Sequence, residues 1–249
     1  MALLEVCNIT KKYNKKSVVD GISFSVDSGD VIGIMGENGA GKSTLLGMLV
    51  TLIKPTSGDI LYNGESIIKK PKIIRGNIGY VPQDVALYQE LTAMDNLKYW
   101  GKTFHLSKEK LNIAIERVSD VIGLDNSVLK KKVSTYSGGM KRRLNIGIAL
   151  LNDPEIIVMD EPTVGIDITS KDQILKVITK LNKEGKTILY SSHYFEELEE
   201  ICNKICIVSQ GKIMEISDID SIIDIDESGK KNNLTEYYLH KYQGKVFLS

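Results

Sequence analysis

The chain has 249 residues, 42% of them apolar, which is enough to bury a hydrophobic core in one compact domain or two small ones. Lys plus Arg and Asp plus Glu both number 32, so the chain has no overall field to hold nucleic acid or an anionic membrane. We therefore expect no nucleic-acid partner, and we interpret the local clusters KKK (130–132) and KRR (141–143) as solvated faces.

The N-terminal region alternates apolar segments with Asn, Asp and Gly turns. This pattern predicts strands over residues 3–9, 22–26 and 31–35. After Gly41 the segment KSTLLGMLVTL has helical spacing, and it stops before the turn cluster KPTSG. The next segment, DILYNG, has strand character again. The sequence thus predicts a strand, a loop, a helix and a strand in succession.

From about residue 87 to residue 151 the apolar spacing is mainly helical, with Ser107 placed to cap one helix, and we interpret this region as a helical insert. Residues 156–159 then read as a buried strand, 171–184 as a helix that ends at Gly185, and 187–190 as a further strand, as in a parallel α/β sheet. Beyond Gly211 an acidic segment (218–227) and a GKKNN turn precede a short helix near 234–242. We expect a main domain over residues 1–213 and a C-terminal extension over 214–249.

A glycine-rich run follows the predicted strand VIGIM and opens the predicted helix. It fits the pattern GxxxxGK[ST] with Gly36, Glu37, Asn38, Gly39, Ala40, Gly41, Lys42 and Ser43. Glycine allows backbone angles closed to other residues, so amide N–H groups can turn inward on a phosphate beside the positive end of a helix. We expect Lys42 to reach the β- and γ-phosphates and Ser43 to ligate Mg²⁺, with Thr44 supporting the phosphate end. This P-loop alone leaves kinases, GTPases and ATPases open.

Two carboxylates, Asp160 and Glu161, end the apolar strand that begins at Ile156. Ligands bind at the ends of strands in parallel sheets, so Asp160 is placed to hold the Mg²⁺ shell. Glu161 follows it, and we expect it to orient the attacking water or accept its proton. The alternative is that DEPT only ends a strand and begins a loop.

The segment TYSGGMKRR narrows the choice. Ser137, Gly138 and Gly139 precede a predicted helix over residues 140–151, and with Met140 they resemble the signature motif of ATP-binding cassette (ABC) ATPases. Kinases and GTPases lack this motif. The remaining family motifs then follow along residues 3–213: an aromatic A-loop at Tyr13, a Q-loop at Gln83, a D-loop that ends at Asp167, and a switch histidine at His193.

The resemblance implies an α/β fold: a P-loop NTPase core with a parallel sheet, an N-terminal antiparallel β subdomain and an inserted helical subdomain. It implies binding of ATP and Mg²⁺, with Tyr13 stacking on adenine, Gln83 reaching both Mg²⁺ and water, and His193 bonding the γ-phosphate. The catalytic residues would be Glu161, His193 and Gln83, and the Mg²⁺ ligands Ser43, Gln83 and Asp160.

The signature motif also predicts partners. Residues 137–139 precede a helix whose N-terminus is suited to phosphate, and the P-loop already supplies one such N-terminus in the same chain. In the resembling family two cassettes close head to tail, so we expect a second nucleotide-binding subunit, in the simplest case a second copy of this chain. The signature has Met140 and Tyr136 where Gln and Leu are usual, a variant associated with exporters whose membrane subunits are separate chains. Ile168 stands where the D-loop usually has Pro.

A separate transmembrane permease is the other expected partner. Residues 84–105, after the Q-loop, resemble the surface that receives a membrane subunit, and the alternative is a plain helical subdomain. Two rival functions stay open at this point: a soluble cassette ATPase acting on ribosomes or DNA, and a small-molecule kinase. Soluble cassettes usually have two cassettes or a long coiled-coil insertion, and the sequence has no 20- to 50-residue repeat. A kinase would need an acceptor pocket in place of the signature.

The sequence further predicts a protein on the cytoplasmic face of the membrane. No stretch reaches the roughly 18 consecutive apolar residues of a membrane helix. The opening residues MALLEVCNIT lack the pattern of a secretory signal. Cys7, Cys202 and Cys206 lack the spacing of a zinc or redox pair, and we expect all three to be buried apolar side chains without chemistry.

Overall fold

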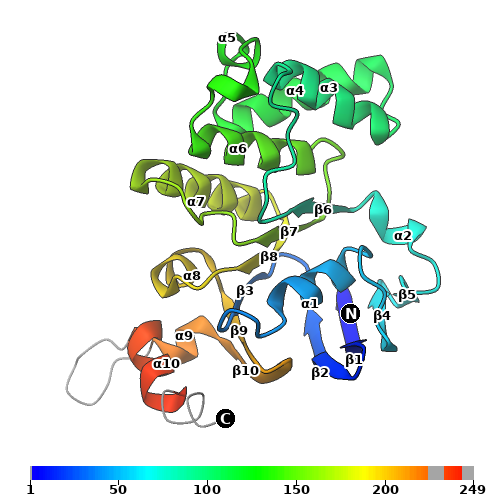
Figure 1. The fold of residues 1–249 in the computed structure, drawn as a ribbon, viewed down its shortest axis with the longest axis vertical. Helices are drawn as coiled ribbons and strands as arrows, with labels where there is room; N and C mark the ends of the chain where they lie inside the picture. The colour runs from blue at the N-terminus through cyan, green and yellow to red at the C-terminus, as the bar shows by residue number, and fades with distance from the viewer. Residues whose placement is uncertain (1, 224–232, 243–249) are drawn as a thin grey trace.

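The computed structural model describes residues 2–223 and 233–242, and within them the strands form two sheets (Figure 1). The first sheet is antiparallel, in the order β2-β1-β4-β5: β1 (Leu4–Tyr13), β2 (Lys16–Val26), β4 (Ser57–Tyr62) and β5 (Glu65–Ser66). The second has the order β10-β9-β3-β8-β7-β6: β3 (Val31–Met35), β6 (Ile78–Val81), β7 (Ile156–Asp160), β8 (Thr187–Ser191), β9 (Lys204–Ser209) and β10 (Lys212–Asp218). Its strands pair in parallel except β10, which is antiparallel to β9. The predicted α/β fold class is confirmed.

Helices surround the second sheet and form a separate group beyond α7 in Figure 1. Their bounds are α1 (Lys42–Leu49), α2 (Lys72–Arg75), α3 (Ala93–Thr103), α4 (Lys108–Ile122), α5 (Asn126–Leu129), α6 (Gly138–Ala149), α7 (Ile168–Lys183), α8 (Phe195–Ile201), α9 (Ile219–Ile222) and α10 (Leu234–Tyr242), with a 3-10 turn at Val133–Thr135. Among the described residues, no helix combines the length and apolar character needed to cross a bilayer.

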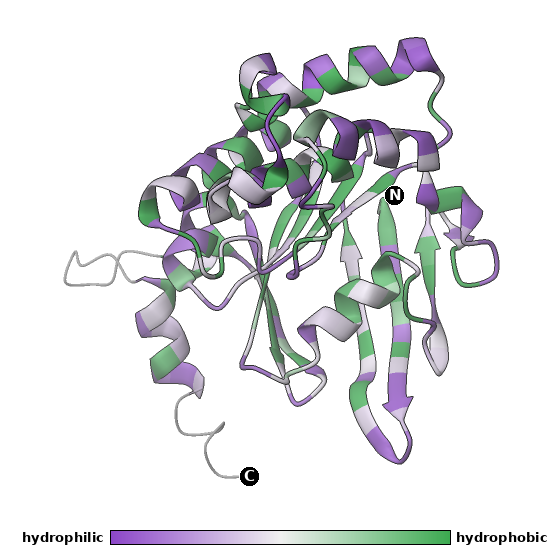
Figure 2. Ribbon diagram, turned by 45° about the horizontal axis from the view of Figure 1, so that its top comes forward, coloured by the Kyte–Doolittle hydropathy of each residue, from purple (hydrophilic) through white to green (hydrophobic). Residues whose placement is uncertain are grey.

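The central strands are buried on both faces, which explains their uninterrupted apolar sequence. Every residue of β3, β7 and β8 is buried. Alternate residues of β7 join different core clusters: Ile157 and Met159 pack on the side of α6 and α7, and Ile156 and Val158 on the side of α1. Figure 2 shows apolar residues, in green, along the strands in the middle of the molecule and many hydrophilic residues on the outer helices.

Two helices begin earlier than their apolar spacing predicted, because polar side chains cap them. The helix expected from residue 171 is α7, which begins at Ile168 since Asp167 Oδ1 accepts a hydrogen bond from the Ser170 amide at 2.9 Å. The helix expected from residue 140 is α6, which begins at Gly138 since Ser137 Oγ accepts from the Met140 amide at 3.2 Å. The predicted cap of α4 is confirmed: Ser107 Oγ accepts from the Lys110 amide.

The structure also corrects two expectations about buried side chains. Cys202 and Cys206 are buried as predicted, and burial raises the pKa of the Cys206 thiol to about 12. Cys7 is exposed, because in β1 it faces the side opposite to buried Val6. Arg142, predicted on a solvated face, is 5% exposed.

The C-terminal segment packs against the rest of the chain. The predicted boundary after residue 213 lies inside β10, which pairs with β9. The predicted short helix is present as α10, and the predicted acidic segment and GKKNN turn lie partly outside the described residues. The Tyr238 ring of α10 packs on Phe195 of α8, with ring centroids 5.2 Å apart.

Glu215 of β10 holds α10 in place through hydrogen bonds with its side chains. Its carboxylate accepts hydrogen bonds from Tyr237 Oη at 2.7 Å, Tyr242 Oη at 2.5 Å and Lys241 Nζ at 2.9 Å. Burial alone would raise the pKa of Glu215, but these hydrogen bonds outweigh burial and lower the pKa from 4.5 to about 2. A depressed carboxylate pKa stabilises the fold above the unfolded pKa, and this stabilisation is lost as the pH falls through the folded pKa. The docking of α10 should therefore weaken between pH 4.5 and about pH 2.

We expect Glu215→Gln to loosen α10 at pH 7, with a loss of about 1–3 kcal/mol in the local free energy of opening, because a charged acceptor of several hydrogen bonds is lost. Hydrogen exchange of the α10 amides measures this. The difference between wild type and variant should shrink as the pH falls to about 2, because Glu215 is then about half protonated. The control is Glu65→Gln, which removes an exposed ion pair with Lys70 and should change little. Equal protection of α10 in wild type and Glu215→Gln at pH 7 would contradict the account.

Candidate active site

The glycine-rich segment between β3 and α1 has the backbone that its sequence predicts. Gly39 has φ +83° and Gly41 has φ +102°, both in the left-handed region that favours glycine. At Gly41 a Cβ would also lie 2.5 Å from the carbonyl oxygen of Val18, so the segment passes too close to β2 for any side chain there. The segment leads directly into α1, whose first amide groups have no acceptor within the helix.

A cavity of about 390 Å³ lies over this segment. Its lining comes from β2, the P-loop, the start of α1, the loop after β6 and the end of β7: Val18, Glu37, Asn38, Gly39, Gly41, Lys42, Ser43, Thr44, Gln83 and Glu161. The fold therefore brings Gln83 and Glu161 to the P-loop across a long stretch of sequence. The volume falls in the range of small-molecule sites, about 300–1,000 Å³.

Lys42 is the buried cation of the cavity, with 5% of the residue exposed. Its Nζ donates to the carbonyl oxygens of Gly36 at 2.7 Å and Glu37 at 3.2 Å. The Glu161 Oε1 atom lies 3.6 Å from the same Nζ, and Glu161 is itself 8% exposed. A buried ammonium and a buried carboxylate attract each other strongly at this distance.

Ser191 organises the two carboxylates at the end of β7. Its Oγ donates to Asp160 Oδ1 at 2.7 Å and accepts from the Glu161 amide at 2.9 Å. Glu161 has φ +46°, a left-handed conformation that costs a non-glycine residue on the order of 1–3 kcal/mol, and the bonds to Ser191 hold it. This turn sends Glu161 to the cavity while Asp160 stays 2% exposed.

His193 lies beside Glu161, and Gln83 lines the same cavity. His193 Nδ1 lies 3.5 Å from Glu161 Oε2, and its ring packs on that of Tyr194 with centroids 4.1 Å apart. The Gln83 backbone is held by Arg142, whose Nη1 donates to Gln83 O at 2.6 Å and Pro82 O at 3.0 Å. Burial lowers the pKa of the Arg142 guanidinium from its usual value, and the negative charge of Asp84 partly offsets this by raising it.

The structure keeps the other predicted site residues apart from this cavity. Tyr13 is 47% exposed at the end of β1, and Lys11 Nζ lies 5.1 Å from the centroid of its ring. Ser137 and Gly138 are exposed at the start of α6, and a Cβ on Gly139 would lie 2.0 Å from Ser170 Oγ. None of these four described residues lines the cavity. The P-loop cavity and the outward-facing start of α6 are thus separate features of the described residues.

Sequence reasoning missed Ser191 and Arg142. Ser191 carried a signal, since it ends the apolar strand ILYS two residues before His193. Arg142 carried none, because the sequence KRR does not distinguish a buried guanidinium from a solvated one.

The candidate Mg²⁺ ligands fit that ion in their chemistry. Ser43 and Gln83 line the cavity with hydroxyl and amide oxygens, and Asp160 supplies a carboxylate at the adjoining strand end. Hard oxygen ligands of this kind suit Mg²⁺, which keeps several waters and takes phosphate oxygens from a nucleotide. Within residues 2–223 and 233–242 no three His, Cys, Asp or Glu side chains gather as a metal site.

Comparisons with known proteins support the same assignment. The family model described as ABC transporter matches residues 19–164. The linearmycin resistance ATP-binding protein LnrL of Bacillus subtilis (strain 168) is 44% identical over 236 residues, 91% of this chain and 76% of that protein. The Nod factor export ATP-binding protein I of Paraburkholderia xenovorans (strain LB400) is 37% identical over 211 residues, 85% of this chain and 69% of that protein.

Among solved structures, the dimeric ATP-binding cassette MJ0796 in a post-hydrolysis state, bound to ADP and Pi, superposes with a TM-score of 0.78. It is 26% identical, and the match covers 86% of this chain and 98% of that chain. The resemblance drawn from the sequence motifs is confirmed. The chain belongs to the ABC transporter family, as an ATP-binding and ATP-hydrolysing cassette.

Proposed function

We propose that this cassette powers transport through a separate membrane subunit by closing head to tail on a second copy of itself. Each ATP would lie between the P-loop of one copy and residues 137–139 of the other. The observation that carries the proposal is the outward-facing start of α6, where Ser137 and Gly138 are exposed and lie outside the cavity of their own chain. A helix start of this kind attracts phosphate. MJ0796, a relative in structure, is itself dimeric.

Nucleotide binding falls to residues along the cavity. Residues 36–41 and the first turn of α1 would hold the phosphates with backbone amides, and Lys42 would bind the β- and γ-phosphates. Tyr13 would stack on adenine from its exposed position at the end of β1. Bound Mg²⁺, held through Ser43, Gln83 and Asp160, would neutralise charge on the β- and γ-phosphate oxygens.

Hydrolysis would use Glu161, His193 and Gln83. Glu161 orients the attacking water and accepts its proton, with its position fixed by Ser191 and Lys42. His193 lies 3.5 Å from Glu161 and would donate to the γ-phosphate. Gln83 would contact the water and the metal through its amide. These groups act on an in-line water only when the second copy closes over the phosphate.

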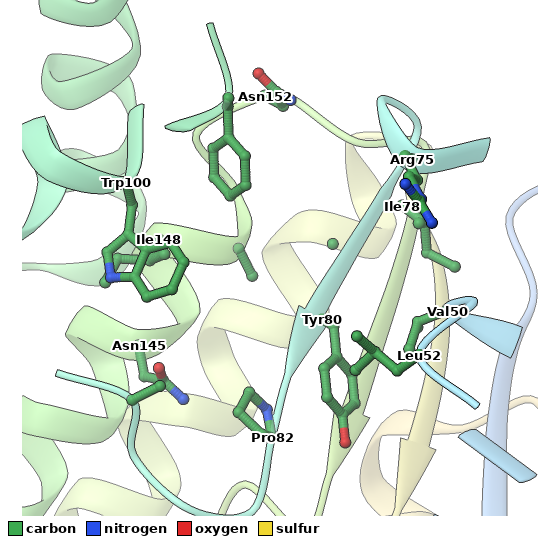
Figure 3. Close-up of a pocket in the computed structure, with 14 residues that line it drawn as sticks. Val50, Leu52, Arg75, Ile78, Tyr80, Pro82, Trp100, Asn145, Ile148 and Asn152 are labelled. Atoms are coloured by element: carbon green, nitrogen blue, oxygen red, sulfur yellow. The ribbon is translucent and has the colours of Figure 1, made fainter. Parts of the chain in front are cut away.

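The membrane subunit would dock in a groove between α3 and α6 on one side and β6 on the other (Figure 3). The groove has a volume of about 340 Å³ and a mainly apolar lining, with Trp100 and Ile148 facing Tyr80 and Leu52. Two buried donors in its wall, Trp100 Nε1 and Asn145 Nδ2, have no hydrogen-bond partner in the described residues. Both atoms are covered by atoms of the chain itself, so a docking helix would rest on the apolar lining rather than on these donors.

Aromatic side chains continue from this groove to the surface. The rings of Tyr99 and Trp100 meet edge to face with their centroids 5.7 Å apart, and the centroids of the Tyr88 and Tyr99 rings are 4.8 Å apart. Tyr88 and Tyr99 are 45% and 44% exposed, and Leu91 is 40% exposed. The prediction that part of segment 87–100 stays exposed is confirmed, whereas Leu97 is buried in the core. Aromatic anchors beside an apolar groove are typical of interfaces.

We further propose export as the direction of transport and the cytoplasmic face of the membrane as the location. Relatives named for Nod factor export and linearmycin resistance support export. The signature variant with Met140 and Tyr136 points the same way. The cargo itself would be set by the membrane subunit.

The docking proposal predicts that Tyr88→Asp combined with Leu91→Asp abolishes membrane recruitment and transport but leaves basal ATP hydrolysis intact. Loss of one buried anchor typically costs about 2 kcal/mol, roughly 30-fold in affinity, and an introduced carboxylate adds a desolvation cost. Membrane association, transport and basal hydrolysis are measured together in cells that contain the cognate membrane subunit.

The matched control is Ile113→Asp, which changes a 67% exposed apolar residue on α4 and should alter none of the three. Unchanged recruitment of the double variant would remove this docking surface from the account. Equal loss of basal hydrolysis would mean that the segment supports the fold instead.

A further inference from the structure

A buried carboxylate outside the catalytic cavity, Glu197 on α8, is 1% exposed. Its Oε2 atom accepts three hydrogen bonds from hydroxyl groups: Thr163 Oγ1 at 2.7 Å, Tyr190 Oη at 2.6 Å and Ser192 Oγ at 3.0 Å. Its Oε1 atom lies 3.0 Å from Lys171 Nζ, in an ion pair whose geometry is not that of a hydrogen bond. Removing a carboxylate from water is costly, so a site with four polar partners for one buried carboxylate is a built feature of the fold.

The partners of Glu197 come from the segments that carry the proposed hydrolytic residues. Thr163 lies two residues after Glu161, in the turn that follows β7. Ser192 lies between β8 and His193. Lys171 is in the first turn of α7, just after the D-loop residue Asp167. One carboxylate therefore ties together the chain segments that follow two neighbouring strands of the sheet.

The direction of the hydrogen bonds matters for His193. Ser192 gives its hydroxyl proton to Glu197, so its oxygen is left as an acceptor, and it accepts the Tyr194 amide at 3.0 Å. The two bonds fix the backbone on both sides of His193. Burial, and next the charge of Glu197, raises the pKa of Tyr190, so the Tyr190 hydroxyl keeps its proton and remains a donor.

We propose that Glu197 is a positioning residue of the hydrolytic site, holding His193 and the turn after Glu161 in a fixed mutual arrangement. The inference rests on the proposed roles of Glu161 and His193. Glu197 does not line the P-loop cavity; it acts through the Ser192 hydroxyl and the Thr163 hydroxyl. Loss of Glu197 should therefore slow the chemical step and leave ATP binding by the P-loop nearly unchanged.

Glu197→Gln is the informative variant because it keeps the volume of the side chain. All three hydroxyls donate to one oxygen and an ammonium faces the other, so the amide NH₂ meets a donor or a cation in either orientation. We expect kcat to fall about 5- to 30-fold, as for loss of a charged hydrogen bond, and KM for ATP to change less than about threefold. The measurement uses the full chain at a concentration where wild-type specific activity is constant.

Asp30→Asn is the matched control. Asp30 is also a buried carboxylate, 6% exposed, that pairs with Lys204 at 2.8 Å and precedes β3 at the strand end remote from the P-loop. It should lower thermal stability while kcat stays at the wild-type value. Comparable kcat losses in Asp30→Asn and Glu197→Gln would mean that the effect is general destabilisation, and would overturn the proposal.

A double variant separates positioning from any other role. Because Glu197 acts partly through His193, adding Glu197→Gln to His193→Ala should slow kcat by a smaller factor than the same substitution does in the wild-type chain. Fully additive losses, or a wild-type kcat in Glu197→Gln alone, would overturn the inference. A wild-type kcat in His193→Ala alone would instead show that the proposed role of His193 is wrong. The two failures are thus distinguishable.

Discussion

Glu161→Gln is expected to lower ATP turnover about 10²- to 10⁴-fold while ATP binding persists, because the amide keeps the shape of the side chain but cannot accept a proton. The geometry gives the carboxylate its role. Its two oxygens lie 3.6 Å from Lys42 Nζ and 3.5 Å from His193 Nδ1, at the wall of the cavity that the P-loop lines. ATP-loaded dimers should accumulate, since closure no longer leads to hydrolysis.

Single-turnover hydrolysis, the ATP dissociation constant and the size of the ATP-loaded species test this result together. The matched control is Glu155→Gln at the other end of β7, where the carboxylate accepts a hydrogen bond from Tyr62 Oη at 2.7 Å. It should hydrolyse ATP at the wild-type rate. Wild-type turnover in Glu161→Gln would remove Glu161 from the catalytic role.

Ser137→Arg should reduce hydrolysis to background although the P-loop of the same chain is intact. The substitution places bulk and positive charge on the exposed helix start and removes the Ser137 cap of α6. Loss of a cap alone costs only about 1 kcal/mol, so the fold should survive. Nucleotide binding to the isolated chain should persist because residues 137–139 lie outside the cavity.

Ser107→Arg is the control for this variant. Ser107 is also an exposed serine cap, at the start of α4, and its Oγ accepts the Lys110 amide at 3.3 Å. Both substitutions remove a serine cap and add an arginine, so they should destabilise their helices by similar amounts; they differ only in where they lie on the chain. Similar loss of hydrolysis in both would show that helix stability, not the face at Ser137, is responsible.

Local sequence signals predicted the elements that hold the site. Apolar runs bounded by Gly, Asp or Ser identified β3, β7 and β8, since strands of a parallel sheet are buried on both faces. The P-loop was predictable because its glycines are required by backbone geometry and by close approach to Val18. The starts of α6 and α7 were misjudged, because apolar periodicity says nothing about a side-chain cap.

Features that depend on tertiary contacts could not be predicted in the same way. Ser191 reaches Asp160 because β7 and β8 are neighbours in register, and no local pattern gives that strand order. Glu197 sits in the run FEELEE, which reads as a solvated helix face. Its burial comes from contacts with Thr163 and Lys171, which follow the neighbouring strand β7.

The central claim is that each hydrolytic site is built from two copies of the chain, and mixed dimers test it most directly. Lys42→Ala destroys the P-loop of one copy and keeps its signature, whereas Ser137→Arg does the reverse. A mixed dimer of the two holds one composite site with both parts intact. Equal mixing should restore about one quarter of the wild-type rate, because half of randomly paired dimers are mixed and each has one working site. A mixture no faster than either variant alone would contradict the head-to-tail model.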